Sequence, residues 1–198
     1  MSNSEQGAIA RLAERAAAVG LGDFSPKAVE QAKLILLDTL GCGFAALSDE
    51  CAGAVLATVQ AFGEAPLCTL IGRAQRTSAP SAVLVNGTLI RVLDLNDYVV
   101  GAAAASGARG GHPSDNIPVA LAAAELSGSS GGDLLAAILL GYEIYGRGKA
   151  LMDAHSPWDG ISISGLAAPA MAGRLLRLAR HQLAHAIALG AARAPTPV

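Results

Sequence analysis

The stretch from residue 86 to residue 118 alone gathers carboxylate, amide, phenol and imidazole side chains between two apolar segments of this sequence. His112 stands there in a polar, glycine-flanked turn, and an imidazole with its ordinary pKa of about 6.5 suits proton transfer at neutral pH. Asp94 and Asp97 precede it and could fix its tautomer and raise its basicity. Equally, both carboxylates could be solvated groups at the end of a helix. The spacing alone favours neither interpretation.

Further polar side chains flank this histidine on both sides in the sequence. Asn96 and Tyr98 lie beside the carboxylates, and Ser114 follows the histidine. Two arginines, Arg91 and Arg109, are candidates for binding the carboxylates of a substrate, although a solvated loop charge is the commoner fate of such a residue. This polar cluster is the strongest candidate for function in the chain.

Two other patterns imitate known sites but lack essential parts. His181 and His185 share one face of a helix as zinc ligands do, but Gln182 replaces the catalytic glutamate and no third ligand is evident in the sequence. The glycines between residues 101 and 111 lack the lysine and hydroxyl of a phosphate-binding loop and follow no strand. We therefore expect a surface histidine pair, no metal site and no cofactor.

Helical periodicity predicts the elements that position the cluster. Apolar residues recur at helical spacing, with start signals at Ser25–Pro26, at Ser78 and at a Ser130/Asp133 capping box. One β-type run, Pro66–Ile71, allows a single strand or hairpin at most. The expected fold class is all-α, with helices over residues 9–19, 26–47, 54–62, 79–93, 116–126, 131–147, 163–176 and from 180 onward.

The polar cluster should then lie between the end of helix 79–93 and the start of helix 116–126. Ser114 or Asp115 is the expected cap of the second of these helices. Residues 101–111 are mostly glycine, serine and alanine, a composition typical of a mobile loop. Functional side chains are often carried by loops held on rigid helices, as here.

Three packing features are also expected. From Gly41 onward, helix 26–47 has almost no polar residue, so its C-terminal half should be buried on all sides. Glu143 and Arg147 have the spacing of an i,i+4 ion pair. Helix 163–176 is rich in alanine and glycine, and such small residues permit a close approach by another helix.

The amino-acid composition limits which kinds of protein this chain could be. Hydrophobic residues make up 52% and charged residues 15%, so some apolar surface is expected to meet another chain or domain. A net charge of −2 with dispersed Arg and Lys argues against nucleic acid, and no apolar stretch reaches the roughly 18 uninterrupted residues of a membrane helix. Three cysteines match no zinc motif and the N-terminus has no signal pattern, which favours the reducing cytoplasm.

Four segments of the chain resemble the MmgE/PrpD family. They are KLILLDTLGCGFAAL (33–47), NGTLIRVLDLNDY (86–98), GGHPSDNIPVALAAAE (110–125) and GYEIYGR (141–147). The resemblance runs nearly from end to end, and the second and third segments are its most specific part. These two are most similar to the 2-methylcitrate dehydratase side of the family.

The resemblance implies a helical domain that forms a dimer interface and the base of an active site, so a homodimer is expected. It also implies acid–base chemistry on small di- or tricarboxylates without a metal. His112 matches the family's active-site histidine, and Asp94 matches the aspartate paired with it. Together with the polar neighbours described above, the candidate substrate-binding residues are Asn96, Asp97, Tyr98, Arg109, Ser114 and Asp159.

Three features depart from the family. The family's chain is more than twice as long and continues into an α+β lid domain whose lysines complete the pocket. Residues 1–198 are therefore expected to be a single helical domain, truncated before that lid. Many relatives have Asp-His where this chain has Asp159-Gly160, and Tyr98 stands where the decarboxylases carry threonine. Near His112, only Arg109 is evident in the sequence as a cation for a trianionic substrate.

The expected function is that of a carbon–oxygen lyase that removes water from 2-methylcitrate or a related small tricarboxylate, with His112 as acid/base and Asp94 as its partner. Decarboxylation of cis-aconitate or epimerisation of iminodisuccinate is the alternative within chemistry, because the same histidine could serve it. An inactive helical module that keeps only a dimerisation surface is the alternative from another class, and the low charge and early end of the chain favour it.

Overall fold

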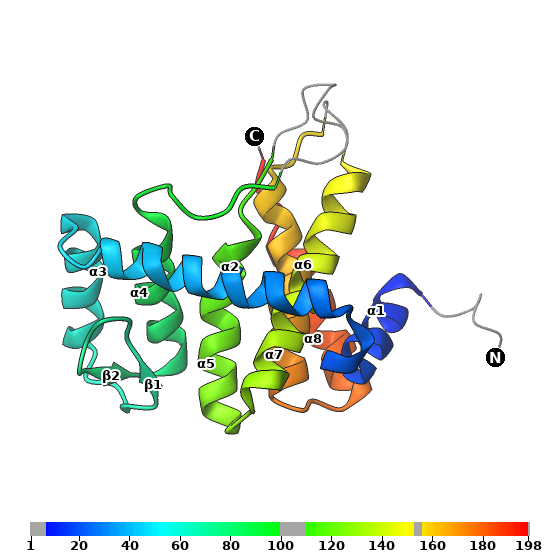
Figure 1. Ribbon diagram of the computed structural model, residues 1–198, viewed down its shortest axis with the longest axis horizontal. Helices are drawn as coiled ribbons and strands as arrows, with labels where there is room; N and C mark the ends of the chain where they lie inside the picture. The colour runs from blue at the N-terminus through cyan, green and yellow to red at the C-terminus, as the bar shows by residue number, and fades with distance from the viewer. Residues whose placement is uncertain (1–6, 100–109, 153–155, 198) are drawn as a thin grey trace.

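The computed structural model describes residues 7–99, 110–152 and 156–197, and these residues fold mainly into helices (Figure 1). The helices and strands are α1 (Ala8–Ala18), η1 (Leu21–Asp23), α2 (Pro26–Ala45), α3 (Glu50–Ala61), β1 (Cys68–Thr69), β2 (Arg76–Thr77), α4 (Ala79–Arg91), η3 (Pro113–Asn116), α5 (Ile117–Ser127), α6 (Gly131–Leu151), η4 (Gly160–Ile163), α7 (Ser164–Leu175) and α8 (Arg180–Arg193). The η elements are short 3₁₀ helices. The prediction of an all-α class with one hairpin at most is confirmed.

Side-chain caps begin several helices where the sequence predicts them. Ser25 accepts a hydrogen bond from the backbone N–H of Ala28, and Ser130 forms a capping box with Asp133. The third helix begins at Glu50, earlier than the predicted start at Ala54, because Asp49 caps it. The antiparallel hairpin pairs Cys68 with Thr77 and Thr69 with Arg76.

The start of α5 differs from the prediction. Ser114 and Asp115 do not cap this helix, because they lie within the preceding 3₁₀ turn η3, and no side chain caps α5 itself. Pro118 is accommodated in the first turn, where a backbone N–H has no partner to lose. The side chains of Ser114 and Asp115 are thus free to make other contacts.

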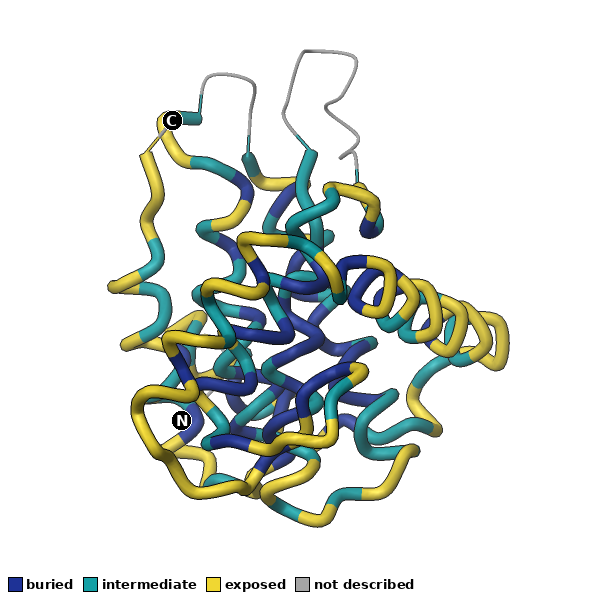
Figure 2. The backbone as a smooth tube through the Cα atoms, turned by 90° about the vertical axis from the view of Figure 1, so that its left-hand side faces the viewer, coloured by how far each residue is buried: buried dark blue, intermediate teal, exposed yellow. Residues whose placement is uncertain are grey.

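Helix α2 lies across the remaining helices, with α3, α4 and the hairpin towards its C-terminal end and α1 towards its N-terminal end (Figure 1). Figure 2 shows the buried parts of the backbone in the interior of the fold. Buried apolar side chains form three clusters. One joins α3, α4 and the hairpin around Leu89 and Ile90. The second joins α1, α6, α7 and α8 around Leu140 and Leu183, and the third joins α5, α6 and α7 around Ile117.

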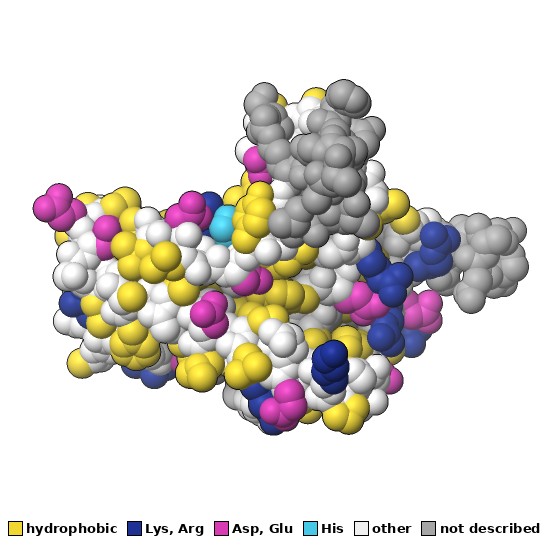
Figure 3. All heavy atoms as spheres, turned by 45° about the horizontal axis from the view of Figure 1, so that its top comes forward, with side chains coloured by type: hydrophobic (Ala, Val, Ile, Leu, Met, Phe, Trp, Pro, Cys, Tyr) yellow, Lys and Arg dark blue, Asp and Glu magenta, His cyan; other side chains and the backbone are white. Residues whose placement is uncertain are grey.

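The prediction that the C-terminal half of α2 is buried on all sides is wrong. Cys42 and Gly43 are buried, but Gly41, Phe44 and Ala45 are exposed, because α2 packs through one side only. Leu34 and Leu37, further towards its N-terminal end, are also exposed. The outer side of α2 therefore carries large apolar side chains, and Figure 3 shows that hydrophobic side chains gather on the surface among scattered charges.

Small residues bring α7 and α8 into close contact, as the sequence predicts. A Cβ on Gly190 would lie 2.3 Å from the backbone oxygen of Gly165, so the two helices touch through their backbones at this point. The predicted ion pair within α6 is also present, with Arg147 Nη2 2.8 Å from Glu143 Oε1.

Within the described ranges, no single helix is long and apolar enough to cross a membrane. Helices α2 and α3 taken together have the length and the apolar composition of a membrane span, but the two helices are bent by 88° relative to each other.

Candidate functional site

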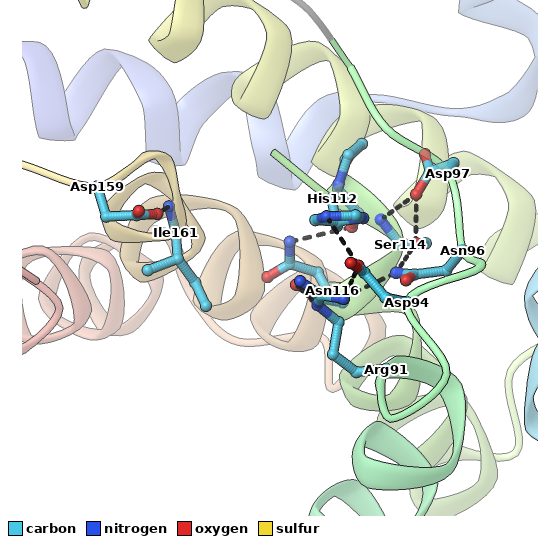
Figure 4. A network of polar contacts seen from close by, with 11 residues as sticks. Arg91, Asp94, Asn96, Asp97, His112, Ser114, Asn116, Asp159 and Ile161 are labelled. Carbon is cyan, nitrogen blue, oxygen red and sulfur yellow. Dashed lines mark hydrogen bonds and ion pairs between the residues drawn. The ribbon is translucent and has the colours of Figure 1, made fainter. Parts of the chain in front are cut away.

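The polar cluster predicted from the sequence assembles where α4 ends and η3 begins. Residues Val99 and Gly111 form a two-sided antiparallel bridge, with N···O distances of 2.8 and 3.0 Å. This bridge brings the segment after α4 alongside the segment before α5. Asp94, Asn96 and Asp97, which follow α4, therefore lie opposite His112 and Ser114, which precede α5 (Figure 4).

His112 and Asp94 form the ion pair that the sequence left undecided. Nε2 of His112 lies 3.6 Å from Oδ1 of Asp94, a separation slightly longer than a hydrogen bond. The Asp94 side chain is 70% exposed and that of His112 is 14% exposed. Nδ1 of His112 is buried and has no hydrogen-bond partner in the structure. The Nε2 edge, beside the exposed carboxylate, is consequently the edge that a molecule from solvent can approach.

Arg91, the C-terminal residue of α4, connects two carboxylates of the site. Its Nη1 donates to Asp94 Oδ1, and its Nε lies 3.8 Å from Asp115 Oδ2. Burial raises the pKa of the Asp115 carboxyl, and the Arg91 charge and the Asn96 amide oppose that rise. Arg91 thus fixes the position of Asp94 next to the imidazole.

Asp97 is the centre of a second, more buried network. It accepts hydrogen bonds from the Ser114 hydroxyl, from the Ser114 backbone N–H at 3.2 Å and from the Tyr142 hydroxyl at 2.8 Å. The buried side chain of Asn96 donates to Ser114 Oγ at 2.8 Å and to Asp115 Oδ1 at 3.0 Å. These contacts join the two segments of the site to α6 and hold them in place.

Tyr98 borders the imidazole on its other side. Its ring lies edge-on to His112, with the ring centroids 5.0 Å apart and the planes at 64°. The Tyr98 hydroxyl accepts a hydrogen bond of 2.9 Å from the backbone N–H of Gly110. Tyr98 is itself exposed and forms part of the rim around the histidine.

Helix α6 contributes three polar side chains that the sequence analysis did not assign to the site. Tyr142, Tyr145 and Lys149 recur at i, i+3 and i+7, so they lie along one side of the helix. Tyr142 bonds Asp97, and the backbone N–H of His112 faces the Tyr145 hydroxyl. Burial raises the pKa of both phenols, and the Asp97 and Asp115 carboxylates raise them further. Their spacing along one side of the helix was the signal that could have identified them.

The structure does not bring every predicted residue into this cluster. Asp159 caps η4, where its Oδ1 accepts from the N–H of Ile161 at 2.9 Å, and it lies apart from the hydrogen-bonded groups around His112 (Figure 4). Arg109 lies outside the described residues, as does most of the predicted loop 101–111. His181 and His185 form an exposed pair on α8, with ring centroids 6.4 Å apart.

The arrangement can transfer a proton at the imidazole edge. His112 supplies an imidazole, the Asp94 carboxylate lies beside it, and Asn96, Ser114 and Tyr98 are polar neighbours. Among residues 7–99, 110–152 and 156–197, no three His, Cys, Asp or Glu side chains gather closely enough to hold a metal ion.

The chain is similar in sequence to a known protein family and to two curated proteins. The model of the MmgE/PrpD N-terminal domain matches residues 10–197. The probable 2-methylcitrate dehydratase of Saccharomyces cerevisiae is 36% identical over 102 residues, which are 51% of this chain and 19% of that protein. The mitochondrial 2-methylcitrate dehydratase of Yarrowia lipolytica is 30% identical over 177 residues, 82% of this chain and 33% of that protein. The chain therefore spans a third or less of the curated relatives it matches.

Proposed function

Because the chain belongs to the MmgE/PrpD family, by a match to the N-terminal domain over residues 10–197, we propose that it forms the helical part of a hydro-lyase active site. The proposed reaction is the removal of water from 2-methylcitrate or a related small tricarboxylate. The two relatives named as 2-methylcitrate dehydratases support this substrate class.

The observation that carries the proposal is the His112–Asp94 pair at the exposed edge of the polar cluster. Nε2 lies 3.6 Å from the carboxylate, so a protonated imidazole at this position has a negatively charged neighbour. A carboxylate near an imidazole stabilises the imidazolium and makes the neutral form a better base. Asp94 is in turn fixed by Arg91. An ordinary surface histidine needs no such support.

In the proposed step a base removes a proton from the carbon next to a carboxylate, a carbon–carbon double bond forms, and the neighbouring hydroxyl leaves with a second proton as water. His112 is the proposed acid/base, and Asp94 its orienting or substrate-binding partner. Asn96, Asp97, Tyr98 and Ser114 line the site. Deprotonation and departure of the hydroxyl need groups on opposite sides of the substrate, so a second acid/base outside this cluster belongs to the mechanism.

Proton NMR tests reaction and residue together. The protein, in the full length that its coding region encodes, is incubated in turn with 2-methylcitrate, citrate and cis-aconitate, beside His112→Ala and His185→Ala variants. We expect signals of an unsaturated product from 2-methylcitrate, lost in His112→Ala and kept in His185→Ala, because His185 is an exposed residue on α8. A folded protein that turns over none of the three acids would refute the lyase proposal.

The same experiment separates the alternative chemistry. Itaconate-type methylene signals from cis-aconitate would assign a decarboxylase. With iminodisuccinate added as a fourth substrate in D₂O, loss of the proton signal at a stereocentre by exchange would assign an epimerase. His112 could serve either reaction, since each also moves a proton next to a carboxylate.

A second role, self-association, is favoured by the outer side of α2. Leu34, Leu37 and Phe44 are each more than half exposed there, and large apolar side chains on a surface are typical of an interface. We propose a homodimer through this side. Sedimentation of the wild type and of a Leu37→Lys/Phe44→Lys variant tests it: a dimer that the variant converts to monomer is expected. If the protein is such a dimer and turns over none of the acids, a non-catalytic dimerisation module describes it better than a lyase does.

The proposed compartment is a reducing one. Cys42, Cys51 and Cys68 are free thiols, as the cytoplasmic expectation requires, and the Yarrowia relative carries a mitochondrial name.

A further inference from the structure

Lys149 is a buried cation beside the candidate site. It lies in the C-terminal half of α6, and only 3% of its surface is exposed. The sequence contains two other lysines, Lys27 and Lys33, and both lie exposed on α2. Lysine is almost never fully buried without a charged or polar partner, because its ammonium loses hydration. A lysine in this place therefore calls for a specific explanation.

The ammonium lies against two glycines that border the histidine segment. A Cβ on Gly160 would lie 2.9 Å from Nζ of Lys149 and 3.0 Å from the carbonyl oxygen of Gly110. Nζ, Gly160 and Gly110 are thus packed together, and any side chain at residue 160 would take the place of the ammonium. Gly110 is followed by Gly111 and His112, and a Cβ on Gly111 would lie 2.1 Å from the Tyr145 hydroxyl. Lys149 is therefore the next group along the side of α6 that faces the histidine segment.

The charges of the site leave a need for a cation. Asp94, Asp97 and Asp115 place three carboxylates around the histidine, while Arg91 is already engaged by two of them. A di- or tricarboxylate entering such a site must be offset by positive charge, since burying an unpaired carboxylate is costly. Lys149 is the remaining cationic side chain that the described part of the site contains.

The environment of Lys149 supports a ligand-binding role. Burial lowers the pKa of its ammonium, and the Asp159 carboxylate partly opposes this effect. Burial of the ammonium at this position thus costs stability, and an anion beside it would offset that cost. The packing around Gly160 gives the amine a defined place, which an exposed lysine does not have.

We propose that the Lys149 ammonium, which packs against Gly160 and the Gly110 carbonyl, binds a carboxylate of the substrate. This inference rests on the proposed function in one respect: it takes the ligand to be a small di- or tricarboxylate. The positive charge that binds the substrate would then come from α6, whereas the sequence analysis found a candidate for it only in Arg109.

Selective labelling makes the inference directly observable, because the 198-residue sequence contains three lysines. The protein is labelled with ¹³C at the lysine ε-carbon, and the ε-CH₂ signals are assigned with Lys149→Met and Lys27→Met variants. Citrate is the probe. We expect the Lys149 signal to shift saturably as citrate is added, while the Lys27 and Lys33 signals stay in place. The inference is overturned if the Lys149 signal stays in place while citrate saturates a site elsewhere in the protein. It is also overturned if citrate does not bind to the protein at all.

Two variants extend the test to affinity. Lys149→Met keeps the length of the side chain and removes its charge, and we expect it to weaken citrate binding about tenfold, as for loss of a hydrogen bond to a charged group. Gly160→Ala keeps the charge but crowds Nζ, so it should weaken binding as well. Lys27→Met is the matched control and should bind citrate as the wild type does. Unchanged citrate affinity in a folded Lys149→Met protein contradicts the inference.

These results are distinguishable from failure of the proposed function. A Lys149 signal that moves with citrate in a protein that dehydrates nothing supports the carboxylate site and refutes the lyase. A protein that converts 2-methylcitrate through His112, with an unchanged KM in Lys149→Met, refutes the carboxylate site and supports the lyase. In the turnover assay we expect the Lys149→Met change to raise KM more than it lowers kcat, because the group binds a carboxylate away from the reacting carbon.

Discussion

The carboxylate of Asp94 reaches to within 3.6 Å of Nε2 of His112 from a backbone in the left-handed region, with φ at 54°. Residues with a Cβ pay about 1–2 kcal/mol to adopt this conformation, although aspartate and asparagine are tolerated there better than others. The turn after α4 is therefore shaped so that a short acidic side chain meets the imidazole. The backbone and the side chain at residue 94 can be tested separately.

Asp94→Asn should keep the turn and lose the charge. Asparagine tolerates the left-handed conformation and alanine does not, so Asp94→Ala should be less stable than Asp94→Asn by about 1 kcal/mol. Both variants lose the ion pair with Arg91, which is therefore common to the comparison. Urea unfolding of the two proteins measures the difference. Equal stabilities would show that the positive φ imposes no cost at this residue.

The Asp94→Asn and Asp94→Ala variants also test the proposed acid–base chemistry. Because both variants remove the carboxylate that supports His112, both should lose turnover of 2-methylcitrate by at least about tenfold, whatever their stabilities. Glu50→Gln, on the exposed start of α3, is a control that should leave turnover unchanged. Turnover that survives in Asp94→Asn would remove Asp94 from the proposed mechanism.

Tyr142 is expected to stabilise the site through Asp97. Its hydroxyl donates at 2.8 Å to a carboxylate that also accepts from Ser114, and a hydrogen bond to a charged group contributes about 1.5–3 kcal/mol. Tyr142→Phe should lower the free energy of unfolding by about 2 kcal/mol. Tyr98→Phe is the comparison, because its exposed hydroxyl accepts one hydrogen bond from an uncharged group, the Gly110 N–H, so its loss should be smaller, at most about 1 kcal/mol. Chemical denaturation of both variants decides; equal losses would mean that Asp97 does not depend on Tyr142.

Much of this architecture could be predicted from the sequence, because local signals specify it. Ser25, Ser78 and Ser130 cap helices where their side-chain chemistry predicts, and the polar cluster lies between α4 and α5 as expected. Local patterns do not report which side of a helix another helix covers. The C-terminal half of α2 is apolar all round but packs on one side, so its burial was predicted wrongly.

Contacts between distant segments explain the rest. The sequence identified His112 and Asp94 but could not show that they meet, because their approach depends on the Val99–Gly111 bridge and on Arg91. Tyr142 and Lys149 were missed for a related reason. Only the packing of α6 against the histidine segment brings Tyr142 to Asp97 and Lys149 close to Gly160, and a helical pattern does not report such contacts.

Close packing of α7 on α8 should make Gly190 intolerant of any side chain. A Cβ there would lie 2.3 Å from the backbone oxygen of Gly165, which cannot move without displacing α7. Gly190→Ala should therefore destabilise the protein by at least about 2 kcal/mol, as overpacking does. Gly41→Ala in α2 is the matched helical control: no atom lies within 4 Å of its Cβ, so it should gain about 0.5–1 kcal/mol. Thermal unfolding of the two variants measures both changes in stability. The prediction requires that Gly190→Ala lowers the stability and that Gly41→Ala raises it.

Lys149 should make stability depend on pH in a direction that a surface lysine does not. Its pKa is lowered from 10.5 in the folded chain by burial, so between the two values the unfolded chain binds more protons. The free energy of unfolding contributed by this residue therefore rises as pH increases towards 10.5. The buried thiols and phenols, whose pKa values are raised, act in the opposite direction at alkaline pH.

A comparison of variants isolates the lysine, because the thiols and phenols are the same in each protein. Lys149→Met should be at least as stable as the wild type at pH 7, since it removes the burial of a charge, and the difference should shrink as pH rises from 7 to 10. Lys27→Met, at an exposed position, should follow the wild type throughout. Urea unfolding at intervals across this range measures the three curves. If Lys149→Met were less stable than the wild type at pH 7, with a gap constant to pH 10, the ammonium would be stabilised by its surroundings rather than kept there for a ligand.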